Sequence, residues 1–252
     1  MQTTAHFPDA ARQWLTTALG QALLGEESRI AEEAFDGIFG EQCLQLGLWG
    51  EANTFLRHTR TQRSVLIDAR EAGDGVTAIG ALHRLPVADD TIDCVLLPHT
   101  LDYSDRPHQI LREVDRVLTA HGHLMILGFK PGGLWGIRRL IPGAGLPPNA
   151  DHIVSDRQLK DWLKLLDFRI HGTLRYFFHW PLPGIRGKNS PRWERRGRRF
   201  WPELAACYML TAQKRVSTLT PVRPLWWRKP QVVAGLVEPT TRVSRIRFDE
   251  NS

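Results

Sequence analysis

The chain has 252 residues, of which 42% are hydrophobic and 24% are charged. This length and composition predict one sizeable α/β domain with appendages, and no apolar stretch approaches the length of a membrane-spanning helix. Met1–Ala10 has no basic segment followed by an apolar one, so we expect no secretory signal. Cys43, Cys94 and Cys207 lie in apolar runs without the spacing of metal ligands, which indicates buried free thiols in a reducing cytoplasm.

The net charge of +6 is concentrated in two C-terminal segments. Residues 186–199 carry seven Arg or Lys and one Glu, and residues 214–252 carry eight Arg or Lys and three acids. The two segments together contribute +11, so the rest of the chain carries −5. The basic character therefore belongs to these segments, and the remainder of the chain is mildly acidic.

Apolar residues at helical spacing predict a helical region from Asp9 to about Phe39. Gly25 is expected to break it, and a second helix is expected from Ser28 to Phe39. We predict that residues 1–40 pack on the core as a helical segment, followed by an α/β domain and a basic, Pro-rich tail. The predicted bounds of these last two parts are 41–215 and 216–252.

Two glycines and an acid follow the first two predicted strands. The strand that begins at Cys43 leads into Gly47 and Gly50, and the strand Ser64–Ile67 ends at Asp68. In open α/β sheets, such glycines let the backbone approach a nucleotide, and such an acid accepts hydrogen bonds from ribose hydroxyls. Asp68 is therefore a candidate ribose ligand, although it can also be a simple turn residue before the third strand, residues 76–79.

A strand–helix–strand unit occupies residues 85–131. The apolar run Ile92–Leu97 precedes an amphipathic helix from about Pro107 to Leu118, and a second apolar run covers Leu124–Phe129. A short apolar run on each side of an amphipathic helix predicts two parallel, buried strands.

This unit resembles strands 4 and 5 of class I methyltransferases that use S-adenosylmethionine (SAM), in the type 11 branch. The resemblance rests on Leu85-Pro86, Ile92-Asp93, Leu111-Arg112-Glu113, Arg116-Val117-Leu118 and Gly122, all in register. It implies a Rossmann-like α/β fold with a mostly parallel seven-stranded sheet in the order 3-2-1-4-5-7-6. The closing antiparallel hairpin would be formed by residues 168–178 and 204–214, with helices on both faces of the sheet. The resemblance also implies SAM as the cofactor.

The family usually carries an acid and then Gly-x-Gly-x-Gly around the end of its first strand. This chain has Gln45 in place of the acid, Gly47 at the first glycine, Trp49 at the second, and Gly50 one residue later. The resemblance makes these two glycines and Trp49 candidate cofactor residues. Trp49 would either pack on the adenosine side or plug the pocket.

Two further positions of the family's cofactor site can be assigned by the same resemblance. The family often places an adenine-binding Asp four residues before Leu85, where this chain has Ala81. The adenine contact is therefore expected to be either absent or made by backbone atoms of Ala81 and Leu82. Pro98 and His99 follow the fourth strand, at the carboxyl end of the sheet where ligands bind in such folds.

His99 is also the candidate catalytic base, with Asp102 and Tyr103 close to it in sequence. Its unperturbed pKa of about 6.5 suits a base, which methyl transfer needs only when the acceptor is protonated. The alternative is a histidine that holds the loop in place by hydrogen bonds. No metal site is expected.

Downstream, residues 132–141 are predicted to form a short helix, and residues 142–151 a Pro/Gly-rich loop that could act as a lid. Ser155 and Gln158 form a capping box for a further helix. The insertion 179–202 combines Trp and Pro with the basic run, a composition that suits RNA or an anionic membrane surface. A solvated basic loop is the alternative to such a polyanion contact.

The sequence thus favours a cytoplasmic SAM-dependent methyltransferase whose acceptor it does not identify. The second hypothesis is a non-catalytic methyltransferase-like domain that binds a partner or nucleic acid through its basic C-terminal segments. A nicotinamide dehydrogenase is disfavoured, because the first strand is followed by too few glycines and the last strands form a hairpin rather than a second mononucleotide-binding half.

Overall fold

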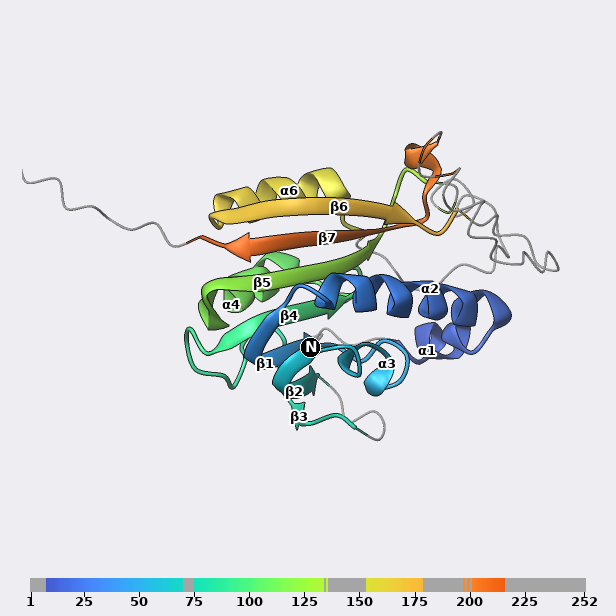
Figure 1. The fold of residues 1–252 in the computed structure, drawn as a ribbon. Coiled ribbons are helices and arrows are strands. Elements are labelled where there is room, and N and C mark those ends of the chain that lie inside the picture. The colour runs from blue at the N-terminus through green and yellow to red at the C-terminus, as the bar shows by residue number, and fades with distance from the viewer. Residues whose placement is uncertain are drawn as a thin grey trace, which may run out of the picture. The chain divides into compact units, whose positions relative to one another are not determined.

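The computed structural model describes residues 8–69, 75–133, 135, 153–178, 197, 199 and 201–215. These residues form a seven-stranded sheet in the order β3-β2-β1-β4-β5-β7-β6 (Figure 1). The parallel strands are β1 (Phe39–Leu46), β2 (Arg60–Asp68), β3 (Ala78–Ile79), β4 (Ile92–Pro98) and β5 (Leu118–Phe129). β7 (Cys207–Lys214) runs antiparallel to both β5 and β6 (Phe168–Tyr176). The predicted strand order and closing hairpin are therefore confirmed.

Helices cover both faces of this sheet and enclose two hydrophobic cores. One core contains side chains of α1 (Asp9–Leu15), α2 (Ala18–Phe35) and α3 (Asn53–Leu56), and the other those of α4 (Pro107–Val117) and α6 (Asp156–Leu165). A 3₁₀ turn, η1 (Pro202–Leu204), precedes β7. Along β4, Cys94 and Leu96 enter the first core, whereas Val95 and Leu97 enter the second. This alternation follows from the two-residue period of a strand.

The central strands are as deeply buried as their apolar sequences predict. None of six residues of β4 and β5 is more than 1% exposed: Cys94, Val95, Leu96, Leu124, Ile126 and Leu127. Cys43 and Cys207, like Cys94, are buried and form no disulfide.

The residues that carry the type 11 resemblance form a clamp between α4 and the loop before β4. Glu113 accepts a hydrogen bond from the backbone N–H of Leu85 at 2.8 Å. Arg116 donates to the carbonyls of Leu85 and Val87 at 3.1 and 2.9 Å, and it also pairs with Glu113. The motif thus fixes the loop that leads into the central strand.

The N-terminal helices differ from the prediction. The break falls between α1 and α2 at Thr16 and Thr17, because the Thr17 hydroxyl accepts the N–H of Gly20 and caps α2. Gly25 lies inside α2, where a glycine costs only about 1 kcal/mol relative to alanine. The helix ends at Phe35, and β1 begins at Phe39, four residues before the expected Cys43.

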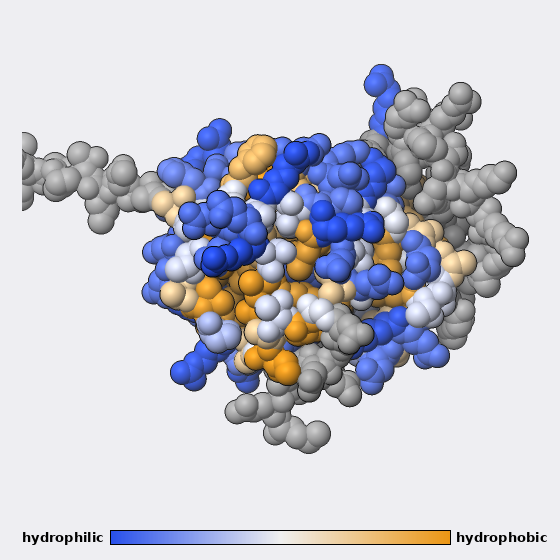
Figure 2. All heavy atoms as spheres, turned by 60° about the horizontal axis from the view of Figure 1, so that its bottom comes forward, coloured by the Kyte–Doolittle hydropathy of each residue, from blue (hydrophilic) through white to orange (hydrophobic). Residues whose placement is uncertain are grey.

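The β3 edge of the sheet is short and partly apolar. β3 has two residues instead of the expected four, and Ile79 is 56% exposed. Figure 2 views the molecule from the lower side of Figure 1 and shows hydrophobic residues at the surface there.

One further C-terminal prediction can be compared with the structure, and the others lie largely or wholly outside the described residues. Ser155 caps α6, since its hydroxyl accepts the Gln158 N–H at 3.2 Å. The short helix 132–141, the lid 142–151, most of the insertion 179–202 and the tail 216–252 lie largely or wholly outside the described residues.

Candidate functional site

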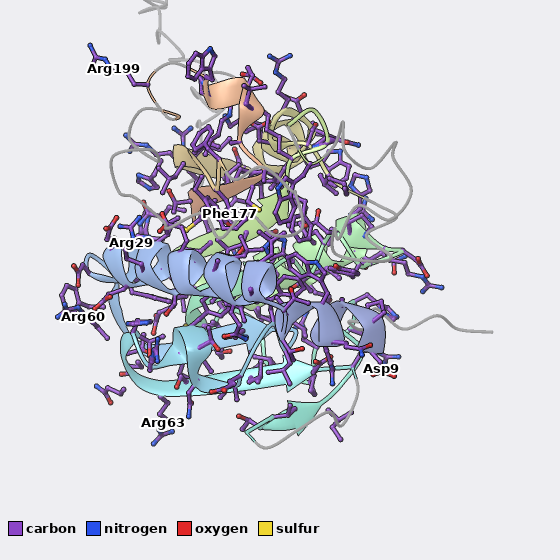
Figure 3. The ribbon with its side chains drawn as sticks, turned by 90° about the vertical axis from the view of Figure 1, so that its right-hand side faces the viewer. Asp9, Arg29, Arg60, Arg63, Phe177 and Arg199 are labelled. Carbon is purple, nitrogen blue, oxygen red and sulfur yellow. The ribbon has the colours of Figure 1, made fainter. Side chains whose placement is uncertain are left out.

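The loop after β1, the end of β2 and the turn after β4 lie together at the carboxyl edge of the sheet. Helix α2 passes close to this edge, as Figure 3 shows from the right-hand side of Figure 1. Arg29 and Arg60 lie at the surface near one end of α2, and Asp9 marks the start of α1. Two polar sites occur here, a buried cluster around His99 and a cavity between α2 and the loop after β1.

Glu27 of α2 is the centre of the buried cluster. Its Oε1 lies 2.7 Å from His99 Nε2 and accepts the Tyr176 hydroxyl at 3.0 Å, and its Oε2 accepts the indole N–H of Trp49 at 2.9 Å. All four residues are fully buried. The carboxylate therefore joins α2 to the turns after β1 and β4 and to the end of β6.

Asp102 holds the other side of His99. Its Oδ2 lies 3.1 Å from His99 Nδ1 and accepts the Phe129 N–H at 3.0 Å, and its Oδ1 accepts the Val154 N–H at 3.4 Å. His99 itself adopts a left-handed backbone conformation, with φ of 55°. Both ring nitrogens are engaged by carboxylates, so the geometry matches the predicted alternative of a histidine that holds the loop.

The two carboxylates keep His99 charged at neutral pH. Burial alone lowers the pKa of His99, but the charge of Glu27 and the hydrogen bonds to Asp102 and Glu27 outweigh it and raise the pKa to about 9. Burial raises the pKa of Asp102 above its ordinary value, and the contacts with His99 oppose this shift. The cluster therefore places two carboxylates around one imidazolium.

Trp49 lies inside this cluster. Its ring centroid is 4.6 Å from that of His99 and 6.0 Å from those of Tyr103 and Phe129. Because the side chain is fully buried in the core beneath α2, it does not line the neighbouring cavity.

Asp68, the predicted ribose ligand, is also fully buried. Its Oδ1 accepts the Ala69 N–H at 2.6 Å, and its Oδ2 accepts the Leu48 N–H at 3.0 Å. Arg12 of α1 lies 3.6 Å from the same Oδ2. Asp68 therefore organises the start of the loop after β1, and Arg12 covers it from α1.

The glycines of this loop have the backbone conformation that the motif requires. Gly47 and Gly50 have φ of 90° and 79°, backbone angles that residues other than glycine rarely adopt. Gln45 donates from Nε2 to the Gly47 carbonyl at 3.0 Å, a bond that the family's usual carboxylate could not make. The Gln45 amide thus stabilises the turn at Gly47 by donating a hydrogen bond.

The remaining predicted site residues are not brought into one pocket. Leu82 is 1% exposed and belongs to the core on the α4 side of the sheet, while Ala81 is half-buried and accepts the Arg84 N–H. Pro98 is buried at the end of β4 and Tyr103 is half-buried beside Trp49. None of them lines the cavity.

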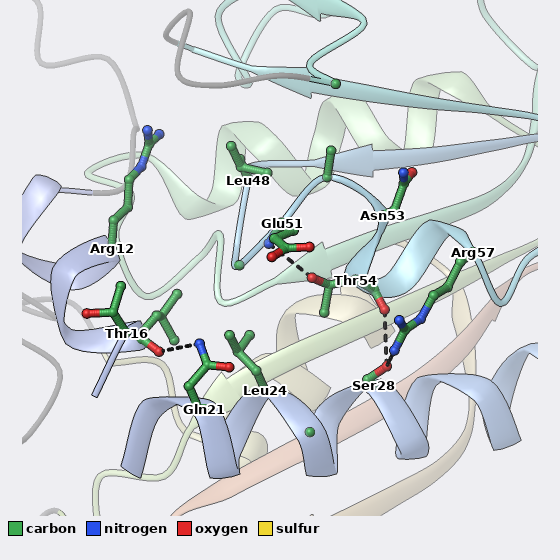
Figure 4. A pocket seen from close by; sticks show the side chains of 15 residues that line it. Arg12, Thr16, Gln21, Leu24, Ser28, Leu48, Glu51, Asn53, Thr54 and Arg57 are labelled. Atoms are coloured by element: carbon green, nitrogen blue, oxygen red, sulfur yellow. Dashed lines mark hydrogen bonds between the residues drawn. The ribbon is translucent and has the colours of Figure 1, made fainter. Parts of the chain in front are cut away.

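A cavity of about 840 Å³ lies between α1, α2 and the segment from Leu48 to Arg57 (Figure 4). Of the predicted cofactor residues, Gly50 lines it. Its polar walls come from residues that the sequence did not single out: Arg12, Thr16, Gln21, Ser28, Glu51, Asn53, Thr54 and Arg57. The volume falls within the range of about 300–1,000 Å³ that is common for small-molecule sites.

Glu27 and Arg12 are the two central residues that sequence reasoning missed. Each reads as an ordinary charged residue of a surface helix. Their partners lie 72 and 56 residues away along the chain, at His99 and Asp68, so no local pattern reveals the pairing.

Comparison with known families finds a match to the central part of the sheet. Residues 40–126 match the model of the methyltransferase domain family known as type 11. This stretch, about a third of the chain, is therefore similar to the class I methyltransferase domains of the type 11 family. The matched range begins in β1 and ends within β5, so it contains the loop after β1, Asp68 and the turn after β4.

One curated relative is YafS of Escherichia coli K12, itself described as uncharacterised. It is 37% identical over 140 residues, which cover 54% of this chain and 54% of YafS. The chain thus spans about half the length of this relative, and the similarity concerns that half alone.

Solved structures share the fold. A SAM-dependent methyltransferase of Thermotoga maritima superposes with a TM-score of 0.58 and 16% identity, covering 78% of this chain and 91% of that one. A SAM-dependent methyltransferase of Archaeoglobus fulgidus gives 0.55 and 16%, covering 77% and 94%. The cyclase SpnF gives 0.53 and 18%, covering 86% and 89%. Since one of these neighbours is named as a cyclase, the shared fold alone does not define the reaction.

In the part of the chain that the structure describes, no group of three or more His, Cys, Asp or Glu is placed to hold a metal ion. No described helix is long and apolar enough to cross a membrane. The second functional hypothesis, a non-catalytic binding domain, depends on basic segments that lie almost wholly outside the described residues, so nothing observed here supports it.

Proposed function

We propose that this chain is a SAM-dependent methyltransferase that binds SAM where the cavity meets the carboxyl ends of β1 and β2. The observation that carries the proposal is the position of the cavity. It opens on Leu48, Gly50 and Ala52, the loop that holds the cofactor motif of the matched family.

The residues around this loop fit such a ligand. A Cβ on Gly50 would lie 3.0 Å from Leu24 and 3.1 Å from the Thr54 hydroxyl, so glycine keeps this wall of the cavity open. Trp49 replaces the second glycine of the motif, but its side chain turns into the core and leaves the cavity unfilled. The departure from the motif is therefore compatible with a bound cofactor.

Asp68 fits the ribose with one condition. Its carboxylate is the acceptor that two hydroxyls require, and it already fixes the loop through the Leu48 N–H. Since the side chain has no exposed surface and Arg12 covers it, ribose binding requires α1 to withdraw Arg12.

The methyl donor sets the protein's task in this proposal. SAM supplies a methyl group activated on sulfur, and the protein contributes proximity and alignment, worth up to ~7–11 kcal/mol in favourable cases.

Several finer assignments stay predictions. They are a base role for His99 with Asp102 and Tyr103, adenine contacts at Ala81, Leu82 and Pro98, a polyanion contact of residues 186–199 and the tail, and a cytoplasmic location. His99 would have to leave its carboxylate partners before it could take a proton from an acceptor.

Calorimetric titration with SAM and S-adenosylhomocysteine tests the proposal. Wild type should bind both, and Asp68→Ala should weaken binding by roughly 1–3 kcal/mol, because a charge-assisted hydrogen-bond acceptor is lost. Asp36→Ala is the matched control, since Asp36 lies at the surface and pairs with Arg60. Absence of binding by wild type at millimolar ligand would overturn the proposal.

A further inference from the structure

Arg57 sits at the end of the cavity remote from Arg12, just after α3 (Figure 4). Its Nη2 donates to Ser28 Oγ at 3.0 Å, and its Nε donates to His58 Nε2 at 3.1 Å. Both partners are neutral acceptors. Arg57 is exposed, and among the described residues no carboxylate forms an ion pair with it.

The partners of Arg57 are themselves fixed. Ser28 is 6% exposed, and its hydroxyl lies 3.1 Å from the Thr54 carbonyl and 2.9 Å from His58 Nε2. Burial and the charge of Arg57 lower the pKa of His58, and Glu32 only partly opposes them. His58 therefore stays neutral at pH 7, and its Nε2 lone pair remains available to the guanidinium.

The result is a cation held in place before any ligand arrives. A guanidinium presents its N–H groups as a planar fork that matches a carboxylate or phosphate, and prior fixing reduces the entropy cost of binding. Thr54 and Asn53 add polar groups to the same end of the cavity. The only carboxylate lining the described cavity is Glu51.

We propose that this end of the cavity is an anion subsite, in which Arg57, held in place by Ser28 and His58, takes a carboxylate or phosphate group of the methyl acceptor. The assignment rests on the proposed function, which places the cofactor at the other end of the cavity, next to Asp68. The acceptor is then a small anionic molecule.

The test compares wild type, Arg57→Gln and Arg57→Lys with Arg60→Gln, a surface control whose native partner is Asp36. Inorganic phosphate and succinate are titrated as simple anions, by calorimetry and thermal shift. Arg57→Gln should lose about tenfold or more in affinity for at least one of them, since a charge-assisted bond is lost. Arg57→Lys, which keeps a point charge without the fork, should lie between the two.

A second pair of ligands identifies the source of the anion. S-adenosylhomocysteine carries a carboxylate, and 5′-methylthioadenosine has no amino-acid group. The proposal predicts that Arg57→Gln leaves the affinity for both unchanged. A loss for S-adenosylhomocysteine alone would assign the subsite to the cofactor's carboxylate and overturn the acceptor assignment.

The two proposals fail in different ways. If wild type binds neither nucleoside but binds an anion through Arg57, the methyltransferase function fails, and with it the assignment to a methyl acceptor, while Arg57 remains an anion site. If the nucleosides bind and all four proteins bind phosphate and succinate equally, or not at all, the subsite is refuted and the function stands.

Discussion

The buried cluster around Glu27 and the cavity beside it lie on the same side of the sheet, yet they differ in how completely their polar groups are paired. Every carboxylate oxygen of Glu27 and Asp102 has a partner, and His99 uses both ring nitrogens. In the cavity, Arg57 has no carboxylate partner among the described residues, and Arg12 Nε and Nη2 are buried without a hydrogen bond there.

This difference separates a part of the molecule that holds the fold from a part that is able to bind. Buried polar groups are almost always paired, so a fully paired cluster is already complete without a ligand. Arg57, an exposed residue beside a cavity of about 840 Å³ and without a carboxylate partner among the described residues, is the group that a ligand would pair with, whereas Arg12 covers Asp68 until a ligand displaces it. Three changes test whether the cluster holds the fold and the cavity binds a ligand.

The largest effect is expected for Glu27→Ala. It leaves the imidazolium of His99 with one carboxylate and removes the acceptor of Trp49 and Tyr176, all fully buried. Breaking a buried ion pair from one side costs about 3–5 kcal/mol in the free energy of unfolding. Urea unfolding measures this loss, and Glu33→Ala on the same helix, whose side chain is 61% exposed, should stay within about 0.5 kcal/mol. Equal effects for the two variants would show that the cluster does not hold the fold.

The second change is in pH. The pKa of His99 is raised from 6.5 to about 9 in the folded chain, so its contribution to stability is fully present below pH 6.5 and is lost as pH rises through about 9. The expected loss is roughly 3 kcal/mol in the free energy of unfolding. His99→Gln should lack this component. A wild-type profile that stays flat across this range would mean that the imidazole is neutral in the folded state.

The smallest effect is expected at the boundary between the two regions. Arg12→Ala removes the ion pair that covers Asp68 and should tighten binding of S-adenosylhomocysteine by about 1 kcal/mol, because the ribose no longer competes with the guanidinium. Arg63→Ala, a surface change on β2, is the control (Figure 3). Weaker binding by Arg12→Ala would instead make Arg12 a ligand contact.

The sequence was informative where structure follows from local pattern. Short apolar runs around an amphipathic helix predicted the central strands, and Ser155 with Gln158 predicted the start of α6. The strand order followed from the type 11 resemblance, whose residues proved to be structural: Glu113 and Arg116 fasten the loop before β4.

The site was less predictable because its contacts join distant parts of the chain. Glu27 looks like the second acid of a surface pair with Glu26, yet it is fully buried against Tyr176, 149 residues away. Arg57 looks like a surface residue between a helix and a strand. What distinguishes both is three-dimensional pairing, which neither periodicity nor motif spacing records.

The most direct test of the account is a crystal structure of the chain with S-adenosylhomocysteine. The account predicts the ribose hydroxyls on Asp68, Arg12 withdrawn from that carboxylate, and the Glu27–His99–Asp102 contacts unchanged. A ligand bound elsewhere, or one seated by displacing Trp49 and His99 from the buried cluster, would contradict it.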